Sequence, residues 1–132
     1  MNASIIIFPG SNCDQDIASS LYLVTKNKPK LVWYTDNIPQ NTDLIVIPGG
    51  FSYGDYLRSG AIASASKIMR DVIAFSKKGI PIIGICNGFQ ILTECKLLPG
   101  TLMINKNLKF ICKEVFLKVF NTESIFLKGI NN

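Results

Sequence analysis

The chain has 132 residues, 48% of them hydrophobic, and its 14 basic and 9 acidic residues give a net charge of +5. This length suits a single domain, and no apolar run approaches the roughly 18 residues that a membrane-spanning helix needs. The lysines are scattered without an aromatic-basic motif, so they indicate a solvated surface rather than a nucleic-acid site. We therefore expect one soluble cytoplasmic domain, residues 1–132, that binds neither membranes nor nucleic acid.

The chain is predicted to begin with a strand and a helix. Residues 4–8, SIIIF, form a continuous apolar run, as expected of a strand buried on both faces. Asn12 and Asp14 in the following loop are candidate N-caps. The helical spacing of later apolar residues predicts a helix, whose apolar stripe consists of Ile17, Leu21 and Val24.

Two strands and a second helix are predicted next. Residues 30–34, KLVWY, and 43–47, DLIVI, have the apolar character of strands. Residues 48–60 are rich in glycine and fit neither period, so we expect a loop. The helix after this loop is marked by Ile68, Met69, Val72, Ile73 and Phe75.

The pattern continues with a strand at 80–85 and a helix at 89–94. Buried strands that alternate with helices predict an α/β fold with a mostly parallel sheet and helices on both faces. Beyond residue 100, short alternating apolar patches predict antiparallel strands. The strands of an α/β sheet are normally covered on both faces, so the chain is expected to end early for this fold.

Residues 84–88, GICNG, have the G-x-C-x-G spacing of a nucleophile elbow, with Cys86 in the place of serine. A sharp strand-to-helix turn lifts the sulfur clear of the sheet, and Gly84 and Gly88 let the strand and helix pack closely. The helix N-terminus favours thiolate, and its unpaired amides are donors for an oxyanion. A buried structural cysteine at a strand end is the alternative interpretation.

A second glycine pair favours the catalytic interpretation. Gly49 and Gly50 follow strand 43–47, and loops after parallel strands open at the same carboxyl edge of the sheet as the elbow. Glycine lets backbone N–H groups approach a ligand closely. A nucleophile that faces a second amide donor is the layout of an acyl-transfer site, whereas a plain turn is the alternative.

The other three cysteines are assigned no chemistry. No pair has C-x-x-C spacing and the chain has no histidine, so we expect no metal site. A disulfide scaffold is not expected in a cytoplasmic chain. We interpret Cys95 and Cys112 as buried small hydrophobes, and we expect helix capping around Cys13.

Long blocks of the sequence resemble the class I glutamine amidotransferases, namely PGGFSYGDYLRSGAIA (48–63) and GICNGFQIL (84–92). With FPGSNCDQD (8–16), LLPG (97–100) and NLKFIC (107–112), the chain resembles the glutaminase subunits of phosphoribosylformylglycinamidine synthase over nearly its whole length. The resemblance implies the flavodoxin-like fold of that family.

The resemblance also implies a reaction. Such a subunit hydrolyses glutamine to glutamate and ammonia. A synthetase subunit, with a small accessory subunit, uses the ammonia and ATP to convert formylglycinamide ribonucleotide to its amidine in de novo purine synthesis. No cofactor is expected in this chain, because ATP and magnesium belong to the synthetase subunit.

Matched by motif, Cys86 corresponds to the nucleophile of this family, and the amides of Gly50 and Asn87 correspond to its oxyanion hole. Residues 52–55 correspond to a loop that borders the pocket. The residues implied to bind glutamine are Gly49, Phe51 and Gln90.

The family pairs its cysteine with a histidine and a glutamate in a C-terminal H-x-E motif, and this chain contains no histidine. We interpret the chain as a C-terminally truncated, incomplete domain, produced by a frameshift, gene decay or a split gene. Three interpretations follow: a glutaminase subunit, a non-catalytic remnant that acts as a binding module, or another enzyme of similar fold, such as a cysteine-elbow protease or glyoxalase.

Overall fold

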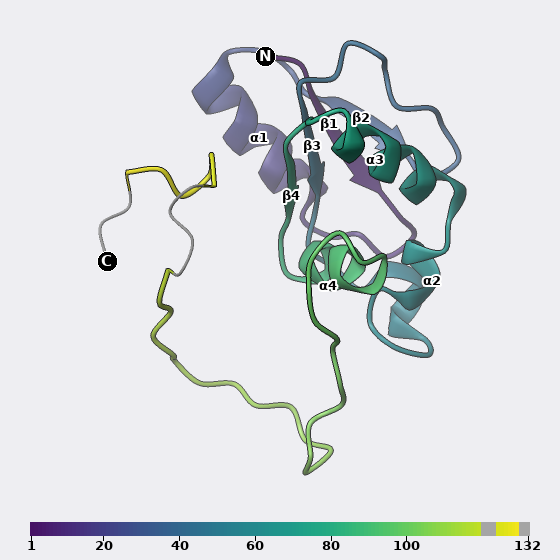
Figure 1. Cartoon of the computed structure of the whole chain (residues 1–132), viewed down its shortest axis with the longest axis vertical. Helices are drawn as coiled ribbons and strands as arrows, with labels where there is room; N and C mark the ends of the chain where they lie inside the picture. Colours follow the sequence, from purple (N-terminus) through teal and green to yellow (C-terminus); the bar gives the residue numbers. More distant parts are fainter. Residues whose placement is uncertain (120–123, 130–132) are drawn as a thin grey trace. The chain divides into compact units, whose positions relative to one another are not determined.

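The computed structural model describes residues 1–119 and 124–129, and its centre is a parallel four-stranded sheet. The strand order is β2-β1-β3-β4, and every neighbouring pair is parallel (Figure 1). The strands are β1 (Ala3–Ile7), β2 (Lys30–Trp33), β3 (Leu44–Ile47) and β4 (Ile82–Gly84). This is the order of the flavodoxin-like folds.

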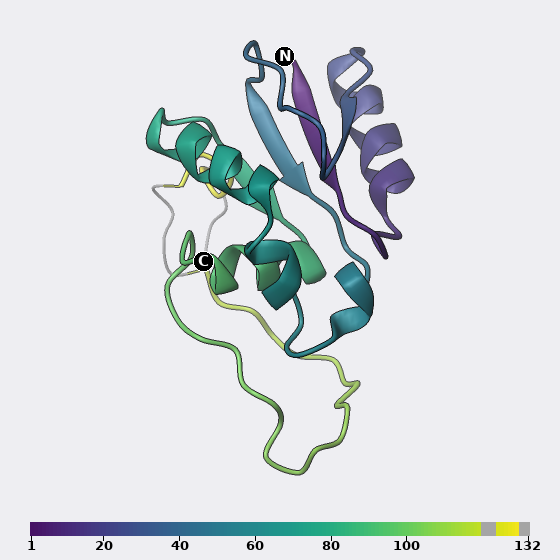
Figure 2. The same cartoon turned by 90° about the vertical axis from the view of Figure 1, so that its right-hand side faces the viewer.

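Helices cover both faces of the sheet (Figure 2). The helix α1 (Asp14–Thr25) lies on one face, where Ile17 and Leu21 pack against the buried Ile5 and Val46. The other face packs against α2 (Ala61–Ser64), α3 (Lys67–Lys77) and α4 (Asn87–Glu94). The predicted parallel α/β fold is therefore confirmed.

The larger part of the core lies between the sheet and α3. Strand residues Ile6, Ile45 and Ile47 are fully buried there. The predicted stripe of α3 is confirmed, because its buried side chains are Ile68, Met69, Val72 and Phe75. Burial of each large apolar side chain contributes about 1.5–3 kcal/mol, so this face supplies much of the stability of the fold.

Two expectations for α1 are wrong. Val24 does not continue the apolar stripe, since it is 83% exposed. The N-cap is Cys13 rather than Asn12 or Asp14, and no side chain caps the helix. Asp14 and Asp16 instead lie in the first turn, where their charges favour the helix dipole.

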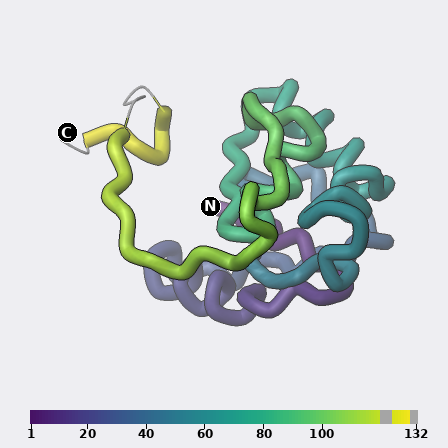
Figure 3. The backbone as a smooth tube through the Cα atoms, turned by 90° about the horizontal axis from the view of Figure 1, so that it is seen from below, coloured from purple at the N-terminus to yellow at the C-terminus, as the bar shows by residue number. Residues whose placement is uncertain are grey.

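Residues 1–102 form a compact unit, and residues 103–132 are a separate unit. Antiparallel strands were predicted beyond residue 100, but residues 101–119 and 124–129 contain no strand. Figure 3 traces the backbone of this stretch in light green and yellow. The alternating pattern is wrong here because a strand also needs a partner for its backbone N–H and C=O groups. The rest of that stretch, 120–123 and 130–132, lies outside the described residues.

Strands β3 and β4 end side by side, which positions the predicted site. Their register pairs Ile47 with Gly84, and the N–H of Ile85 donates to the carbonyl oxygen of Ile47 at 3.1 Å. The two glycine-containing loops therefore leave the sheet at the same edge. Within the described residues, no helix has the length and apolar character to cross a membrane.

Candidate active site

Cys86 lies at the turn between β4 and α4, in a strained backbone conformation. Its φ of 53° and ψ of −109° are unusual for a residue other than glycine, and its side chain is exposed. Such strain costs about 1–3 kcal/mol and persists only where the surrounding structure enforces it. An exposed cysteine on a strained strand-to-helix turn is the geometry of a nucleophile elbow.

The flanking glycines explain how the turn is enforced. A β-carbon on Gly88 would lie 2.0 Å from the carbonyl oxygen of Ile47, so only glycine lets α4 approach β3 this closely. A β-carbon on Gly84 would lie 2.6 Å from the backbone of Gly88 and from Leu92. The strand and helix thus meet backbone to backbone on both sides of Cys86.

Gly49 lies directly beside the elbow. A β-carbon on Gly49 would be 3.4 Å from the β-carbon of Cys86 and 3.7 Å from the carbonyl oxygen of Ile85. The structure therefore brings together the two glycine-containing loops that follow β3 and β4. Because Gly49 has no side chain, its backbone directly borders the space around the Cys86 sulfur.

The loop after β3 is also fixed to the loop after β1. Gly50 has a φ of +147°, and a β-carbon there would lie 2.7 Å from the nitrogen of Asn12. The N–H groups of Asn12 and Cys13 both donate to the carbonyl oxygen of Gly49, at 3.0 and 3.2 Å. The N–H of Phe51 donates to Gly10 at 2.8 Å. Two loops from different strands thus form one rigid border of the site.

Backbone donors are available at this border. Within residues 1–119 and 124–129, no hydrogen bond uses the N–H of Gly50 or of Asn87. Asn87 is the first residue of α4, where N–H groups have no partner inside the helix. These amides are donors of the kind that an oxyanion hole requires.

The side chain of Asn87, for which the sequence predicted no role, is only 2% exposed and uses both ends of its amide. Its Oδ1 accepts from the N–H of Ser52 at 3.1 Å. Its Nδ2 donates to Oδ1 of Asp55 at 3.3 Å and to Oε1 of Gln90 at 3.0 Å. One buried side chain thus connects the nucleophile turn, the 52–55 loop and Gln90.

The 52–55 segment is a short 3₁₀ helix, η1 (Ser52–Asp55), held in strained form. Tyr53 and Asp55 both have positive φ, at 53° and 56°. The Tyr53 ring packs against Tyr34 and Phe8, at 5.8 and 6.2 Å between centroids. Burial, and then the nearby Tyr34, raise the pKa of Tyr53. The packing of its ring holds this loop against the end of the sheet.

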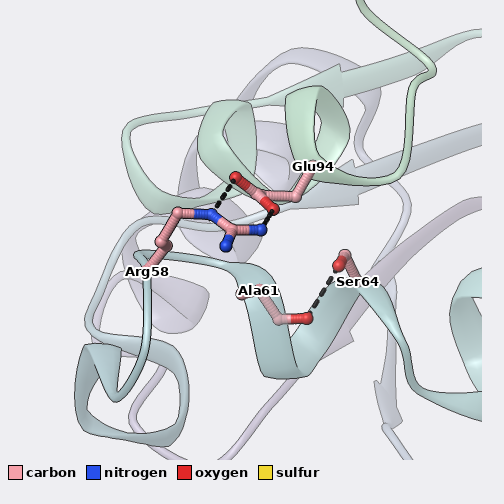
Figure 4. Close-up of polar contacts among 4 residues, drawn as sticks. All are labelled: Arg58, Ala61, Ser64 and Glu94. Atoms are coloured by element: carbon pink, nitrogen blue, oxygen red, sulfur yellow. Dashed lines mark hydrogen bonds and ion pairs between the residues drawn. The ribbon is translucent and has the colours of Figure 1, made fainter. Parts of the chain in front are cut away.

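An ion pair fixes the end of the following loop to α4. Arg58 donates from Nε and Nη2 to the two carboxylate oxygens of Glu94, at 3.2 and 2.7 Å (Figure 4). This hydrogen bonding lowers the pKa of Glu94 and raises that of Arg58. Beside the pair, the hydroxyl of Ser64 donates to the carbonyl oxygen of Ala61 within α2.

The other residues singled out from the sequence differ in how far they are buried. Phe51 borders the site but is 62% exposed. Cys95 is half-buried, so its interpretation as a buried residue is confirmed only in part, and burial raises its pKa. Cys112 is exposed, so its interpretation as a buried residue is wrong. In the part of the chain that the structure describes, no group of three or more metal-binding side chains occurs.

Known proteins with similar sequences identify the family of the chain. The sequence profile of the CobB/CobQ-like glutamine amidotransferase domain matches residues 1–132. The phosphoribosylformylglycinamidine synthase subunit PurQ of Zymomonas mobilis is 54% identical over 129 residues, which cover 97% of this chain and 58% of that protein. The PurQ subunit of Bradyrhizobium diazoefficiens is 50% identical over 132 residues, which cover 99% and 57%.

A solved structure has the same fold. PurLQS from Thermotoga maritima matches with a TM-score of 0.75 at 46% identity, over 85% of this chain and 52% of that chain. The chain thus spans between half and three fifths of the length of these relatives. The family profile covers every residue, and the chain belongs to the CobB/CobQ-like glutamine amidotransferase domain family.

Proposed function

We propose that this chain provides the nucleophile half of the glutaminase site of phosphoribosylformylglycinamidine synthase. The observation that carries the proposal is the exposed Cys86 on its strained turn, with the backbone of Gly49 beside it. Relatives that are about half identical along the whole chain bear the name of this synthase. The fold alone would not support a particular reaction, because many functions share it.

The proposed chemistry begins with attack by the Cys86 sulfur on the side-chain amide carbon of glutamine. The N–H groups of Asn87 and Gly50 stabilise the oxyanion that forms. The carbon–nitrogen bond then breaks, ammonia leaves after protonation, and a thioester remains on Cys86. Water hydrolyses this thioester to glutamate and restores the thiol.

Gln90 is proposed to orient the substrate. Its Oε1 is engaged by Asn87, and no hydrogen bond in the described parts of the chain uses its Nε2. The nitrogen therefore remains as a donor toward glutamine. Gly49 and Phe51 are proposed to border the bound substrate, because both lie on the loop beside the elbow.

A general acid must protonate the leaving ammonia, and these 132 residues contain no histidine. We propose that the histidine and glutamate come from outside them, and that the site works beside an ATP- and magnesium-dependent synthetase subunit and a small accessory subunit in the cytoplasm. The lack of histidine also favours a second candidate, a non-catalytic binding module with the same surface.

Ammonia release from glutamine tests the proposal. The purified chain alone is expected to work about 10²–10⁴-fold more slowly than the PurQ subunit of Zymomonas mobilis, because proton transfer by a positioned side chain contributes about this much. Adding the remaining, histidine-bearing part of that relative, together with its synthetase and accessory subunits, is expected to restore turnover.

The control is Cys86→Ser, which must abolish the restored turnover. Turnover that survives this substitution would refute the proposed nucleophile. If the chain binds the synthetase but never releases ammonia, the binding module is the correct function. If it neither binds nor reacts, both candidate functions are wrong.

A further inference from the structure

We propose that Cys13 and Cys86 form a reversible disulfide, in which Cys13 resolves an oxidised Cys86 and removes the nucleophile from use. The disulfide follows from the positions of the two residues. Its regulatory consequence rests on the proposed glutaminase function.

The two cysteines flank the same glycine. A β-carbon on Gly49 would lie 3.4 Å from the Cys13 sulfur and 3.4 Å from the Cys86 β-carbon. The sulfur of one cysteine is therefore at most twice this distance from the β-carbon of the other. Since Gly49 has no side chain, no side chain of that residue separates them. The proposed bond requires both thiols to rotate and the backbone to shift slightly until the two sulfurs reach disulfide geometry.

The surrounding backbone holds this arrangement in place. On one side, the N–H of Cys13 donates to the Gly49 carbonyl oxygen at 3.2 Å. On the other side, the pairing of Ile47 with Gly84 and the bond from Ile85 to Ile47 fix the elbow beside the same loop. The proximity of Cys13 and Cys86 is thus built into the sheet edge, although 72 residues separate them in sequence.

Exposure assigns the two roles. Cys86 is exposed and meets a dissolved oxidant first, whereas Cys13 is half-buried. An accessible cysteine beside a second cysteine is the arrangement of redox-sensing pairs. Cys95 is unsuited to the first role, because it is half-buried and its thiol donates to the carbonyl oxygen of Leu92 at 3.4 Å.

The proposed oxidant is a peroxide. The Cys86 thiolate attacks one oxygen of hydrogen peroxide, the O–O bond breaks, and a sulfenic acid and hydroxide result. The Cys13 thiol loses its proton to that hydroxide, which gives the first water, and the resulting thiolate attacks the Cys86 sulfur. The S–S bond forms, the S–O bond breaks, and the departing oxygen leaves as water once it is protonated by solvent. Two thiols and one peroxide thus give one disulfide and two waters, and a reducing dithiol reverses the change.

Thiol counting and peptide mapping after treatment of the 132-residue chain with stoichiometric hydrogen peroxide test the proposal. The free thiols are expected to fall from four to two, with one peptide pair that joins Cys13 to Cys86. A dithiol should restore all four thiols. The control substitutions Cys95→Ser and Cys112→Ser should leave this peptide pair unchanged.

Cys13→Ser supplies the decisive comparison. In excess hydrogen peroxide and without a resolving thiol, the Cys86 sulfenic acid should react with a second peroxide to give the sulfinic acid and water, a change that a dithiol does not reverse. Equal sulfinic acid yields with and without Cys13, or a different cysteine pair, would overturn the proposal. These measurements need no glutamine hydrolysis, so they separate the two proposals. A Cys13–Cys86 disulfide in a chain that never supports turnover would refute only the proposed function. Turnover in a chain that forms no such disulfide would refute only this inference.

Discussion

Two helix N-termini at the same edge of the sheet begin with a cysteine, and they differ in nearly everything else. Cys13 precedes α1 with an ordinary φ of −105° and is half-buried. Cys86 precedes α4 with a φ of 53° and is exposed. Both cysteines are adjacent to helix amides, so a helix N-terminus alone does not make a nucleophile site.

The residues after each cysteine account for the difference. Two residues after the cysteine (position +2), the elbow has Gly88, which lies against the backbone of β3. The residue at position +2 in α1 is the exposed Gln15. Position +1 is the buried Asn87 at the elbow and the partly exposed Asp14 in α1. Close packing and a buried amide hold the strained turn at Cys86, and α1 has neither.

The largest expected effect on stability is at position +2. Gly88→Ala should lower the free energy of unfolding by about 3 kcal/mol or more, because the new β-carbon meets a backbone oxygen that cannot move aside. Gln15→Ala should change it by less than about 0.5 kcal/mol, since the site is exposed and alanine favours helices. Urea unfolding of both variants measures the difference, and equal effects would contradict the close-packed elbow.

Position +1 should give an intermediate effect. Asn87→Ala leaves the buried N–H of Ser52 without its acceptor, so we expect a loss of about 1–3 kcal/mol. Hydrogen exchange at the Ser52 amide should accelerate as well. Asp14→Ala should cost less than about 1 kcal/mol, since it removes a charge near a helix terminus and one exposed hydrogen bond from Gln15. Unchanged exchange at Ser52 would show that Asn87 does not hold the 52–55 loop.

The smallest effect is expected where each helix ends. Glu94 closes α4 and pairs with Arg58, whereas Thr25 closes α1 and bonds within its own helix. Because the pKa of Glu94 is lowered in the folded protein, the stabilisation is complete above its ordinary value of 4.5 and is lost as the pH falls through the folded pKa.

Acid unfolding of Arg58→Ala measures this contribution. Between pH 7 and a pH below the folded pKa of Glu94, the free energy of unfolding should fall less for the variant than for the unchanged chain. This difference between the two proteins should shrink in high salt. Arg70→Ala is the matched control, because Arg70 is exposed on α3 and has no ion pair within the described residues. Identical pH profiles for Arg58→Ala and the unchanged chain would eliminate the ion pair as a contributor.

The elbow was predictable from sequence because its determinants are local. Gly84, Cys86 and Gly88 lie within five residues, and the apolar run before them identifies the strand. The hydrophobic periods likewise predicted the sheet and the buried face of α3. In these regions, local pattern and tertiary packing agree.

Other features depend on partners that local pattern does not reveal. The side chain of Asn87 bonds to Ser52 and Asp55, which lie 35 and 32 residues away. The proximity of Cys13 to Cys86 requires the strand order of the sheet and a glycine between them. Val24 fits the helical period but is exposed to solvent, and the period alone does not distinguish it from Ile17 and Leu21.

We propose that Cys86, alone among the four cysteines, attacks glutamine. The most direct measurement is the site of labelling by a chloroketone derived from glutamine, followed over time by mass spectrometry of the reduced chain. We expect Cys86 to be labelled much faster than the other cysteines, and we expect excess glutamine to protect it. Labelling of Cys13, Cys95 or Cys112 at the same rate as Cys86 would contradict the assignment of Cys86 as the nucleophile.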